Sequence, residues 1–182
     1  MWAADGRTLG LFASRRAAEQ AAEHCRRELP HLTILCQGDA SLPELVRTFA
    51  EDEATCLFGT MTLWQGVDGP GSHCRLLSVA RAPVPRPDEP PAPARTRDIN
   101  QRWGSGFMAV SAQHAAVRMA QGAGRLIRSE RDRGVLCICD PRMIEKSYGK
   151  VVWRSLPPMR RTRLEDEAVA FLHTLPPPRS LD

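Results

Sequence analysis

Two stretches of the sequence combine residue types that could contact a nucleotide or a nucleic acid. The first, residues 57–71, reads LFGTMTLWQGVDGPG and follows an apolar run that ends at Phe58. Its glycines permit a ligand to approach the backbone, and Asp68 could hold a ribose hydroxyl or make water-mediated contacts to a metal. The same stretch could equally be a tight turn around a core tryptophan, and its composition leaves both interpretations open.

The second stretch, residues 121–134, reads QGAGRLIRSERDRG. Arg125 and Arg128 are three residues apart, so on a helical turn they project to the same side. Two neighbouring guanidinium groups match the spread oxygens of a triphosphate, a multidentate task that suits arginine better than lysine. The alternative, which the spacing leaves open, is that both are solvated or paired with Glu130 and Asp132.

Short apolar runs alternate with amphipathic stretches along the chain, which is typical of an α/β domain with a mainly parallel sheet. Several runs are apolar throughout, as strands buried on both faces of a parallel sheet are. The expected strands are Thr8–Ala13, Leu32–Cys36, Thr55–Phe58, Cys74–Ala80 and Val135–Cys139. The stretch that follows Phe58 is expected to be a loop.

Amphipathic helices are expected between these strands. The first presents one apolar face, made of Ala18, Ala21, Ala22, Cys25 and Leu29. Ser41 is expected to cap the second, with Glu44 as its capping-box partner. Three more are expected at about 111–123, 142–155 and 164–175. The buried face of the last would contain Leu164, Ala168, Phe171, Leu172 and Leu175.

Residues 82–94 interrupt this alternation, with prolines at positions 83, 85, 87, 90, 91 and 93. Because proline donates no backbone hydrogen bond, the segment must be a loop or a stiff extended arm. It follows the carboxyl end of the fourth expected strand, where open α/β sheets bind their ligands. A plain surface connector fits the composition equally well.

Together, the two stretches resemble motifs V and VI of superfamily 2 helicases, specifically those of the DinG/XPD branch. The matching patterns are G-T-x-x-x-W-Q-G-V-D-x-P-G and Q-G-x-G-R-L-I-R-S-x-x-D-R-G, both long and residue-specific. Leu11–Arg15 is similar to motif IV, and Cys36–Asp39 to the segment that follows it. The resemblance covers roughly residues 7–160 and departs from the family at Ala82–Val84, where Leu-Pro-Phe is usual, and at Gln65, where glutamate is common.

The resemblance implies a RecA-like, three-layer fold of the P-loop NTPase type over residues 1–182, ending in a C-terminal helix and tail at 160–182. It also implies that Arg125 and Arg128 act as arginine fingers on the γ-phosphate of ATP. The residues expected to line the same nucleotide cleft are Gln121, Gly124, Gly66 and Asp68. ATP and Mg²⁺ would be held mainly by a partner, an N-terminal RecA-like half that carries the Walker A and Walker B motifs.

The resemblance further implies contacts to single-stranded DNA and the activity of an ATP-dependent 5′→3′ DNA helicase. Ser14 and Arg15 of motif IV would contact the DNA phosphates. Thr60 and Trp64 of motif V would lie nearer the DNA and couple it to the nucleotide cleft.

The sequence contains no G-x-x-x-x-G-K-[ST], so the chain alone is expected to bind nucleotide weakly and to hydrolyse none. Asp166 and Glu167 match the first half of a D-E-A-H box. The surrounding sequence, however, predicts that they lie on the polar face of an amphipathic helix and not at the end of a strand. The other hypothesis is a non-catalytic DNA- or protein-binding module, a truncated helicase remnant. Walker motifs in a neighbouring reading frame would favour the helicase.

The composition is that of an ordinary globular domain: 182 residues, 42% hydrophobic and 25% charged, with a net charge of +4 that is compatible with nucleic acid. Six cysteines show no C-x-x-C, and the histidines complete no zinc spacing. We therefore expect reduced core cysteines, with no metal site and no iron–sulfur cluster in this chain. No apolar run approaches the ~20 residues of a membrane span, and no signal peptide is recognisable, so a cytoplasmic protein without membrane contact is expected.

Overall fold

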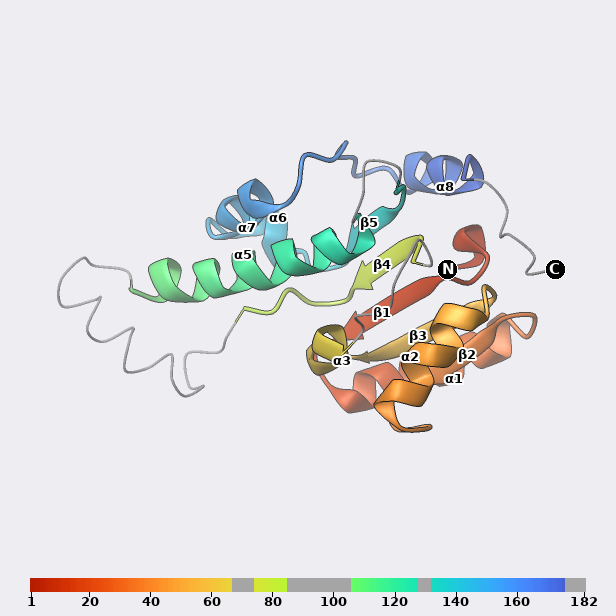
Figure 1. Ribbon diagram of the computed structural model, residues 1–182. Helices are drawn as coiled ribbons and strands as arrows, with labels where there is room; N and C mark the ends of the chain where they lie inside the picture. The colour runs from red at the N-terminus through yellow and green to blue at the C-terminus, as the bar shows by residue number, and fades with distance from the viewer. Residues whose placement is uncertain (67–73, 85–105, 128–131, 176–182) are drawn as a thin grey trace. The chain divides into compact units, whose positions relative to one another are not determined.

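The computed structural model describes residues 1–66, 74–84, 106–127 and 132–175, which contain one five-stranded sheet (Figure 1). Its strands are β1 (Thr8–Phe12), β2 (Thr33–Cys36), β3 (Thr55–Thr60), β4 (Leu76–Val79) and β5 (Val135–Ile138). They are ordered β2-β3-β1-β4-β5, and every neighbouring pair is parallel. The predicted α/β class and the five predicted strands are confirmed. The proline-rich arm lies outside the described residues from position 85 onward.

The chain divides into two compact units. The sheet unit comprises residues 1–81, 126–139 and 160–182, and it holds all five strands. The helical unit comprises residues 82–125 and 140–159. Its helices in the described part of the chain are α5 (Gly106–Leu126, whose last residue belongs to the sheet unit), α6 (Arg142–Glu145) and α7 (Gly149–Ser155).

Crossover helices position the strands of the sheet unit. The helices described in this unit are η1, a 3-10 helix (Trp2–Ala4), α1 (Arg15–Glu28), α2 (Leu42–Glu51), α3 (Met61–Gly66) and α8 (Glu165–His173). Helix α1 leads from β1 past β3 to β2, whereas α2 returns in the opposite direction, from β2 to β3. Because crossovers between parallel strands are right-handed, α1 and α2 lie on opposite faces of the sheet.

The apolar face predicted for α1 is confirmed as part of the core. Ala18, Ala22 and Cys25 are buried, while Ala21 and Leu29 pack at the edge of the same cluster. Its strand residues are Ile34, Cys36, Cys56 and Phe58. The small side chains of α1 let the helix approach β2 and β3 closely, which fixes the position of its N-terminus at the carboxyl end of β1.

Two predictions about the starts of helices are wrong. Ser41 precedes α2 as expected, but its side chain makes no capping hydrogen bond. A cap accepts from the N–H of the second or third helical residue, and Pro43, at the second position, removes one of these two donors. The loop predicted after Phe58 is also absent from the described residues there, because β3 continues to Thr60 and α3 follows at once.

The last predicted helix is present as α8, but its predicted buried face is only partly correct. Leu172 is buried, whereas Leu164 is 62% exposed and Phe171 is 39% exposed. Leu164 stands outside the helix, at its N-cap position. Asp166 and Glu167 lie in the first turn of α8, so the prediction that they belong to a helix is confirmed.

In the helical unit, α5 is longer than predicted and runs through Gly122 and Gly124. One face of this helix carries small buried side chains and a methionine, namely Ala112, Ala115, Ala116, Met119 and Ala123. Ser155 of α7 donates from Oγ to the carbonyl oxygen of Ala116 at 3.1 Å. The small side chains on α5 allow this close contact between the two helices.

The single helix predicted over 142–155 is wrong, because the structure divides it into α6 and α7. Lys146 ends α6 in an extended conformation, with φ −99° and ψ 144°. Gly149 then lies directly against the carbonyl group of Met143, where a side chain would have no room. Trp153 donates from Nε1 to that same carbonyl oxygen at 3.1 Å, which holds the two helices at the break.

Asp140 fixes the start of α6. Its carboxylate accepts from Arg142 Nε at 2.9 Å and Nη2 at 2.7 Å, and from the backbone N–H of Ala82 at 3.0 Å. Burial by itself raises the pKa of Asp140, but these hydrogen bonds outweigh it and lower the pKa below the usual value. The carboxylate therefore stays ionised and anchors Ala82, the first residue of the proline-rich arm.

The prediction that the cysteines are buried is correct for Cys25, Cys36 and Cys56 but wrong for Cys137 and Cys139, which are exposed. All six are free thiols. The apolar run around the last two was expected to be buried on both faces. It forms β5, which is an edge strand of the described sheet and has a neighbour on one side only.

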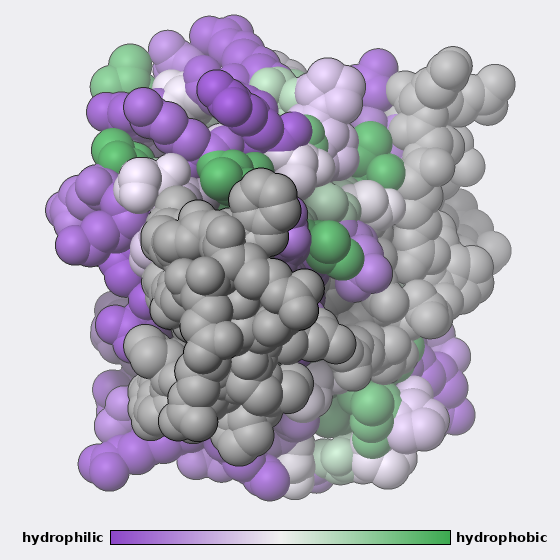
Figure 2. Space-filling view, turned by 90° about the vertical axis from the view of Figure 1, so that its left-hand side faces the viewer, coloured by the Kyte–Doolittle hydropathy of each residue, from purple (hydrophilic) through white to green (hydrophobic). Residues whose placement is uncertain are grey.

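Several large hydrophobic side chains are exposed in the described part of the chain. On the face shown in Figure 2, green residues occur singly among purple hydrophilic ones. The large hydrophobic residues recorded as exposed are Trp2, Leu42, Val117, Ile144, Val151, Leu164 and Phe171. Among the described residues, no helix is both long and apolar enough to cross a bilayer.

Candidate nucleic-acid interface

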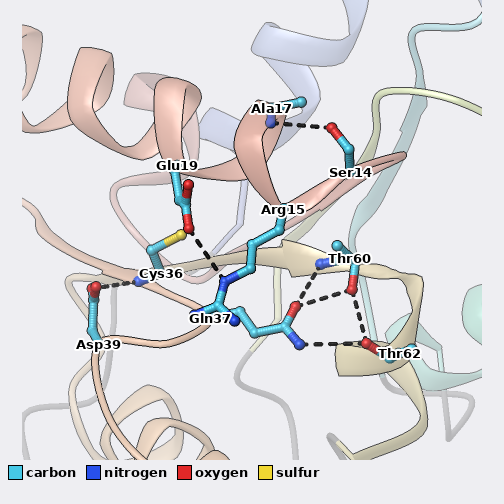
Figure 3. A network of polar contacts seen from close by, with 9 residues as sticks. All are labelled: Ser14, Arg15, Ala17, Glu19, Cys36, Gln37, Asp39, Thr60 and Thr62. Atoms are coloured by element: carbon cyan, nitrogen blue, oxygen red, sulfur yellow. Dashed lines mark hydrogen bonds and ion pairs between the residues drawn. The ribbon is translucent and has the colours of Figure 1, made fainter.

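Three adjacent strands of the sheet unit end at the same edge and bring polar side chains together there. Ser14 and Arg15 follow β1, Gln37 follows β2, and Thr60 is the last residue of β3. Because β2, β3 and β1 are neighbouring parallel strands, their carboxyl ends lie side by side. Figure 3 shows the Arg15 side chain extending toward Gln37, which contacts Thr60 and Thr62, while the Ser14 hydroxyl is turned to the N–H of Ala17. We define this cluster, with Thr62 of α3, as the motif IV–V surface.

Ser14 is the N-cap of α1. Its backbone is extended, with φ −145° and ψ 155°, and its Oγ accepts from the N–H of Ala17 at 3.3 Å. The first N–H groups of an α-helix have no acceptor within the helix, and this cap satisfies one of them. Ser14 is exposed, so the remaining N–H groups of the first turn are presented next to a solvent-facing hydroxyl.

Arg15 lies beside the cap with its guanidinium group largely exposed. Its Nε donates to Glu19 Oε1 at 3.2 Å, and the arginine side chain is 63% accessible. The guanidinium covers Gly38, whose φ is +111°, and a Cβ added at Gly38 would lie 3.0 Å from Arg15 Cζ. Gly38 is therefore needed for the backbone turn after β2, and its lack of a side chain leaves space for the Arg15 guanidinium group.

Gln37 links β2 to the end of β3. Its Oε1 accepts from the backbone N–H of Thr60 at 2.9 Å and lies 3.0 Å from Thr60 Oγ1. Its Nε2 donates to Thr62 Oγ1 at 3.3 Å, and the two threonine hydroxyl oxygens are 2.8 Å apart. One amide group thus holds the Thr60 backbone and orients two hydroxyl groups at the surface (Figure 3).

Asp39 holds the turn on which Gln37 stands. Its Oδ2 accepts from the N–H of Cys36 at 2.8 Å and from Arg26 Nη2 at 2.6 Å. Arg26 also donates to the carbonyl oxygen of Ile34, so α1 is tied to β2 behind the surface. Burial, and secondarily the charge of Asp39, raises the pKa of the Cys36 thiol, which therefore remains protonated beneath the turn.

The electrostatics of the motif IV–V surface favour an anion. The first turn of α1 contains Arg15 and Arg16 and no acidic residue. A helix N-terminus carries partial positive charge, so cations in the first turn reduce helix stability and anions increase it. Two arginines at this position give the helix no advantage, but they add positive charge that attracts a phosphate group, with the Arg15 charge partly balanced by Glu19.

The residues expected at the nucleotide cleft are described only in part. Gln121 and Gly124 are exposed on α5 in the helical unit, and no heavy atom outside that helix lies within 4 Å of a Cβ added at Gly124. Gly66 ends α3, and Arg125 lies on α5. Asp68 and Arg128 lie outside the described residues, as do the side chains of Trp64 and Arg125. No group of three or more metal-ligating side chains occurs among the described residues.

Of the predicted DNA-contacting residues, Ser14, Arg15 and Thr60 lie together on the motif IV–V surface. Gln37 and Thr62 belong to the same surface and were missed as functional residues. A signal for Gln37 was present in the sequence, because it directly follows an expected strand and precedes a glycine. Thr62 had no comparable signal, since it was placed in a loop that is in fact the start of α3.

The sequence of this chain matches a known family and several curated proteins. Residues 1–159 match the family model of the helicase C-terminal domain. ATP-dependent helicase DinG of Mycobacterium tuberculosis (strain H37Rv) is 50% identical over 173 residues, which are 95% of this chain and 26% of that protein. ATP-dependent DNA helicase YoaA of Escherichia coli (strain K12) is 38% identical over 168 residues, which are 92% of this chain and 26% of that protein. The 3'-5' exonuclease DinG of Bacillus subtilis (strain 168) is 29% identical over 162 residues, 87% of this chain and 17% of that protein.

The chain belongs to the helicase C-terminal domain family. Its relatives group it with the DinG-like proteins of that family, and the resemblance identified in motifs IV to VI is confirmed. The all-parallel α/β sheet is consistent with the RecA-like fold expected of such a domain. The chain spans about a quarter of the length of the curated helicases named above.

Proposed function

We propose that this chain acts as the second RecA-like half of a DinG-like ATP-dependent DNA helicase. In this proposal it contacts single-stranded DNA through the motif IV–V surface. It also supplies Arg125 and Arg128 to ATP held, with Mg²⁺, by a first half that carries the Walker A and Walker B motifs. The observation that carries the proposal is the exposed arginine at the capped, acid-free start of α1, beside the Gln37–Thr60–Thr62 network.

The motif IV–V surface has the chemistry of a phosphate-binding site. Arg15 offers charged N–H donors, and the first turn of α1 offers backbone N–H groups that favour an anion. Thr60 and Thr62 add hydroxyl groups; because Thr60 Oγ1 donates to Gln37 Oε1 in the structure, a bound phosphate oxygen would take over a proton from this network. These contacts are directed at the DNA backbone and not at the bases, so binding would be insensitive to sequence and sensitive to salt.

Arg125 and Arg128 would act on the nucleotide. During phosphoryl transfer, negative charge spreads over the γ-phosphate oxygens, and a guanidinium group brought close to them stabilises that charge. Mg²⁺ supplies further neutralisation of the phosphates when bound. Gln121 lies four residues before Arg125 on α5 and is exposed, so it is available to the same ligand.

The test measures DNA-stimulated ATP hydrolysis by the chain alone and by the chain mixed with the preceding segment of the M. tuberculosis relative. We expect activity only in the mixture. Arg125→Ala and Arg128→Ala are each expected to reduce the rate by about 10³-fold or more, the effect of removing an arginine finger. Arg118→Ala is the matched control, because it removes an exposed arginine from the same helix.

Two outcomes would contradict the proposal. Hydrolysis in the mixture that survives both Arg125→Ala and Arg128→Ala would exclude the arginine-finger role. Binding of single-stranded DNA by a folded chain that never supports hydrolysis in the mixture would instead favour a non-catalytic DNA-binding module.

A further inference from the structure

Two exposed thiols lie side by side on β5. Cys137 belongs to the strand, Cys139 follows it directly, and residues two apart on a strand point to the same face. Their Sγ atoms are 3.7 Å apart, and the hydroxyl oxygen of Ser78 on the neighbouring strand β4 lies 4.0 Å from Cys139 Sγ. Among the described residues, no third metal-ligating side chain joins them.

The two thiols have complementary acid–base properties. The hydrogen bond from the Cys137 thiol, with a second contribution from the hydroxyl of Ser78, lowers the pKa of Cys139 to about 6. The same hydrogen bond and burial raise the pKa of Cys137. These shifts favour a thiolate at Cys139 beside a protonated Cys137 thiol. A thiolate is the nucleophilic form of cysteine, and an adjacent thiol can resolve its oxidation product.

The other cysteines give an internal contrast. Cys25, Cys36 and Cys56 are buried, and burial raises the pKa of each thiol, so these groups are protonated and shielded. Cys74 is half-buried beside β4. The structure thus separates one accessible pair from three inert core thiols within the sheet unit.

We propose that Cys137 and Cys139 form a peroxide-oxidisable dithiol, in which Cys139 is the attacking residue and Cys137 the resolving residue. Cys139 Sγ attacks one oxygen of a hydroperoxide, the O–O bond breaks, and the thiolate becomes a sulfenic acid while the peroxide is reduced to water or an alcohol. Cys137 Sγ then attacks the Cys139 sulfur, and the hydroxyl group leaves as water with the Cys137 proton. Counted from the Cys139 thiolate and the Cys137 thiol, the pair loses two electrons and one proton. Solvent supplies the second proton, which the departing hydroxide or alkoxide of the peroxide takes up, and the product is a Cys137–Cys139 disulfide.

The strand geometry makes this disulfide reversible. Residues two apart on a strand have Cα atoms about 6.6–6.8 Å apart, the upper end of the disulfide range, and their nearly parallel Cβ atoms are about as far apart, beyond the ~3.5–4.5 Å that a disulfide needs. Closing the bond must shorten the strand locally, next to the hydrogen bond from the N–H of Cys139 to the carbonyl oxygen of Val79 at 2.9 Å. A strained disulfide is easily reduced, as a reversible modification requires.

The test treats the whole 182-residue chain with hydrogen peroxide at pH 7 and maps each cysteine by peptide mass spectrometry. We expect a Cys137–Cys139 disulfide that dithiothreitol reverses. Cys137→Ser should trap a sulfenic acid at Cys139, detected with dimedone. Cys139→Ser should abolish the disulfide and make oxidation at Cys137 several-fold slower. Cys74→Ser is the control and should leave the disulfide yield unchanged.

A second measurement uses the pH profile. Alkylation of Cys139 by iodoacetamide should be half-maximal near pH 6 and level above about pH 7, whereas an ordinary thiol continues to gain rate up to pH ~8.5. A rate at Cys139 that keeps rising to pH 8.5 would overturn the proposal. So would peroxide oxidation spread evenly over all six cysteines, or disulfides formed only between chains. Neither measurement depends on the proposed helicase function.

Discussion

Helices α1 and α8 of the sheet unit begin in opposite ways. The first turn of α8 carries Glu165, Asp166 and Glu167, and no side chain caps it. The first turn of α1 is capped by Ser14, carries Arg15 and Arg16, and has no acidic residue. Acids near a helix N-terminus stabilise the helix, and cations there destabilise it. The start of α8 therefore serves stability, whereas the charge at the start of α1 does not.

The C-terminal ends of the same helices agree with each other. The last turn of α1 contains Arg26 and Arg27, and that of α8 contains His173, as the helix dipole favours. Of these four helix ends, only the start of α1 carries charges that the helix dipole disfavours, so an arginine-rich composition alone does not explain them. Departures from local rules are expected at functional sites, and this one lies in the stretch that resembles motif IV, for which we propose contact with single-stranded DNA.

The largest effect is expected from Gly38→Ala, a change at the glycine that the Arg15 guanidinium group covers. A side chain at φ +111° strains the backbone, and its Cβ would displace the guanidinium group. We expect the free energy of unfolding to fall by about 1–3 kcal/mol in urea titrations, with weaker binding of single-stranded DNA. Gly124→Ala is the control of opposite sign: it adds a methyl group on an exposed helical position with open space, and should stabilise by about 0.5–1 kcal/mol. Equal effects of the two changes would contradict this account.

A smaller effect is expected from reversing the charge at position 15. Arg15→Glu should weaken binding of single-stranded DNA about tenfold at low salt and reduce the slope of log K against log salt concentration by about one phosphate contact. Arg27→Glu is the matched control, because both arginines are exposed on α1 and each lies near a glutamate four residues away. Fluorescence anisotropy with an oligothymidine measures both. The comparison fails if Arg27→Glu weakens binding as strongly as Arg15→Glu.

The smallest effect, and the most direct test of the two helix ends, comes from neutralising one charge at each. Asp166→Asn should lower the free energy of unfolding by about 0.3–1 kcal/mol, and Arg16→Gln should raise it by a similar amount. Both residues are exposed, so packing changes little. Urea midpoints at low ionic strength measure the difference, and it should largely vanish at about 1 M salt. Changes of the same sign in both variants would show that the dipole argument does not apply here.

The sequence could predict the parts of the fold that depend on local pattern. The apolar runs gave the five strands, and the periodicity of Ala18, Ala22 and Cys25 gave the buried face of α1. Motif resemblance also identified Arg15 and Thr60 as members of a site that the structure brings to one edge of the sheet.

The rest depended on contacts between distant segments. Gln37 and Thr60 are bonded across 23 positions of the sequence, and no local signal specifies that bond. The position of Cys137 and Cys139 at the edge of the sheet followed from strand order, which apolar runs do not reveal. The break between α6 and α7 arises because Gly149 packs against the carbonyl of Met143, a contact absent from any helical repeat.

The order of the strands also has a consequence for the time at which the chain can fold. β1 is the first of the five described strands to be synthesised but lies at the centre of the described sheet, where Thr8 pairs with Cys56 on one side and Leu76 on the other. β1 therefore waits, without either neighbour, until β3 and then β4 have been translated. Sheets built from such distant pairings fold slowly, and their unpaired strands are exposed to aggregation meanwhile. A nascent chain of this domain is thus most prone to aggregate after β1 has been synthesised and before β3 and β4 are available to pair with it.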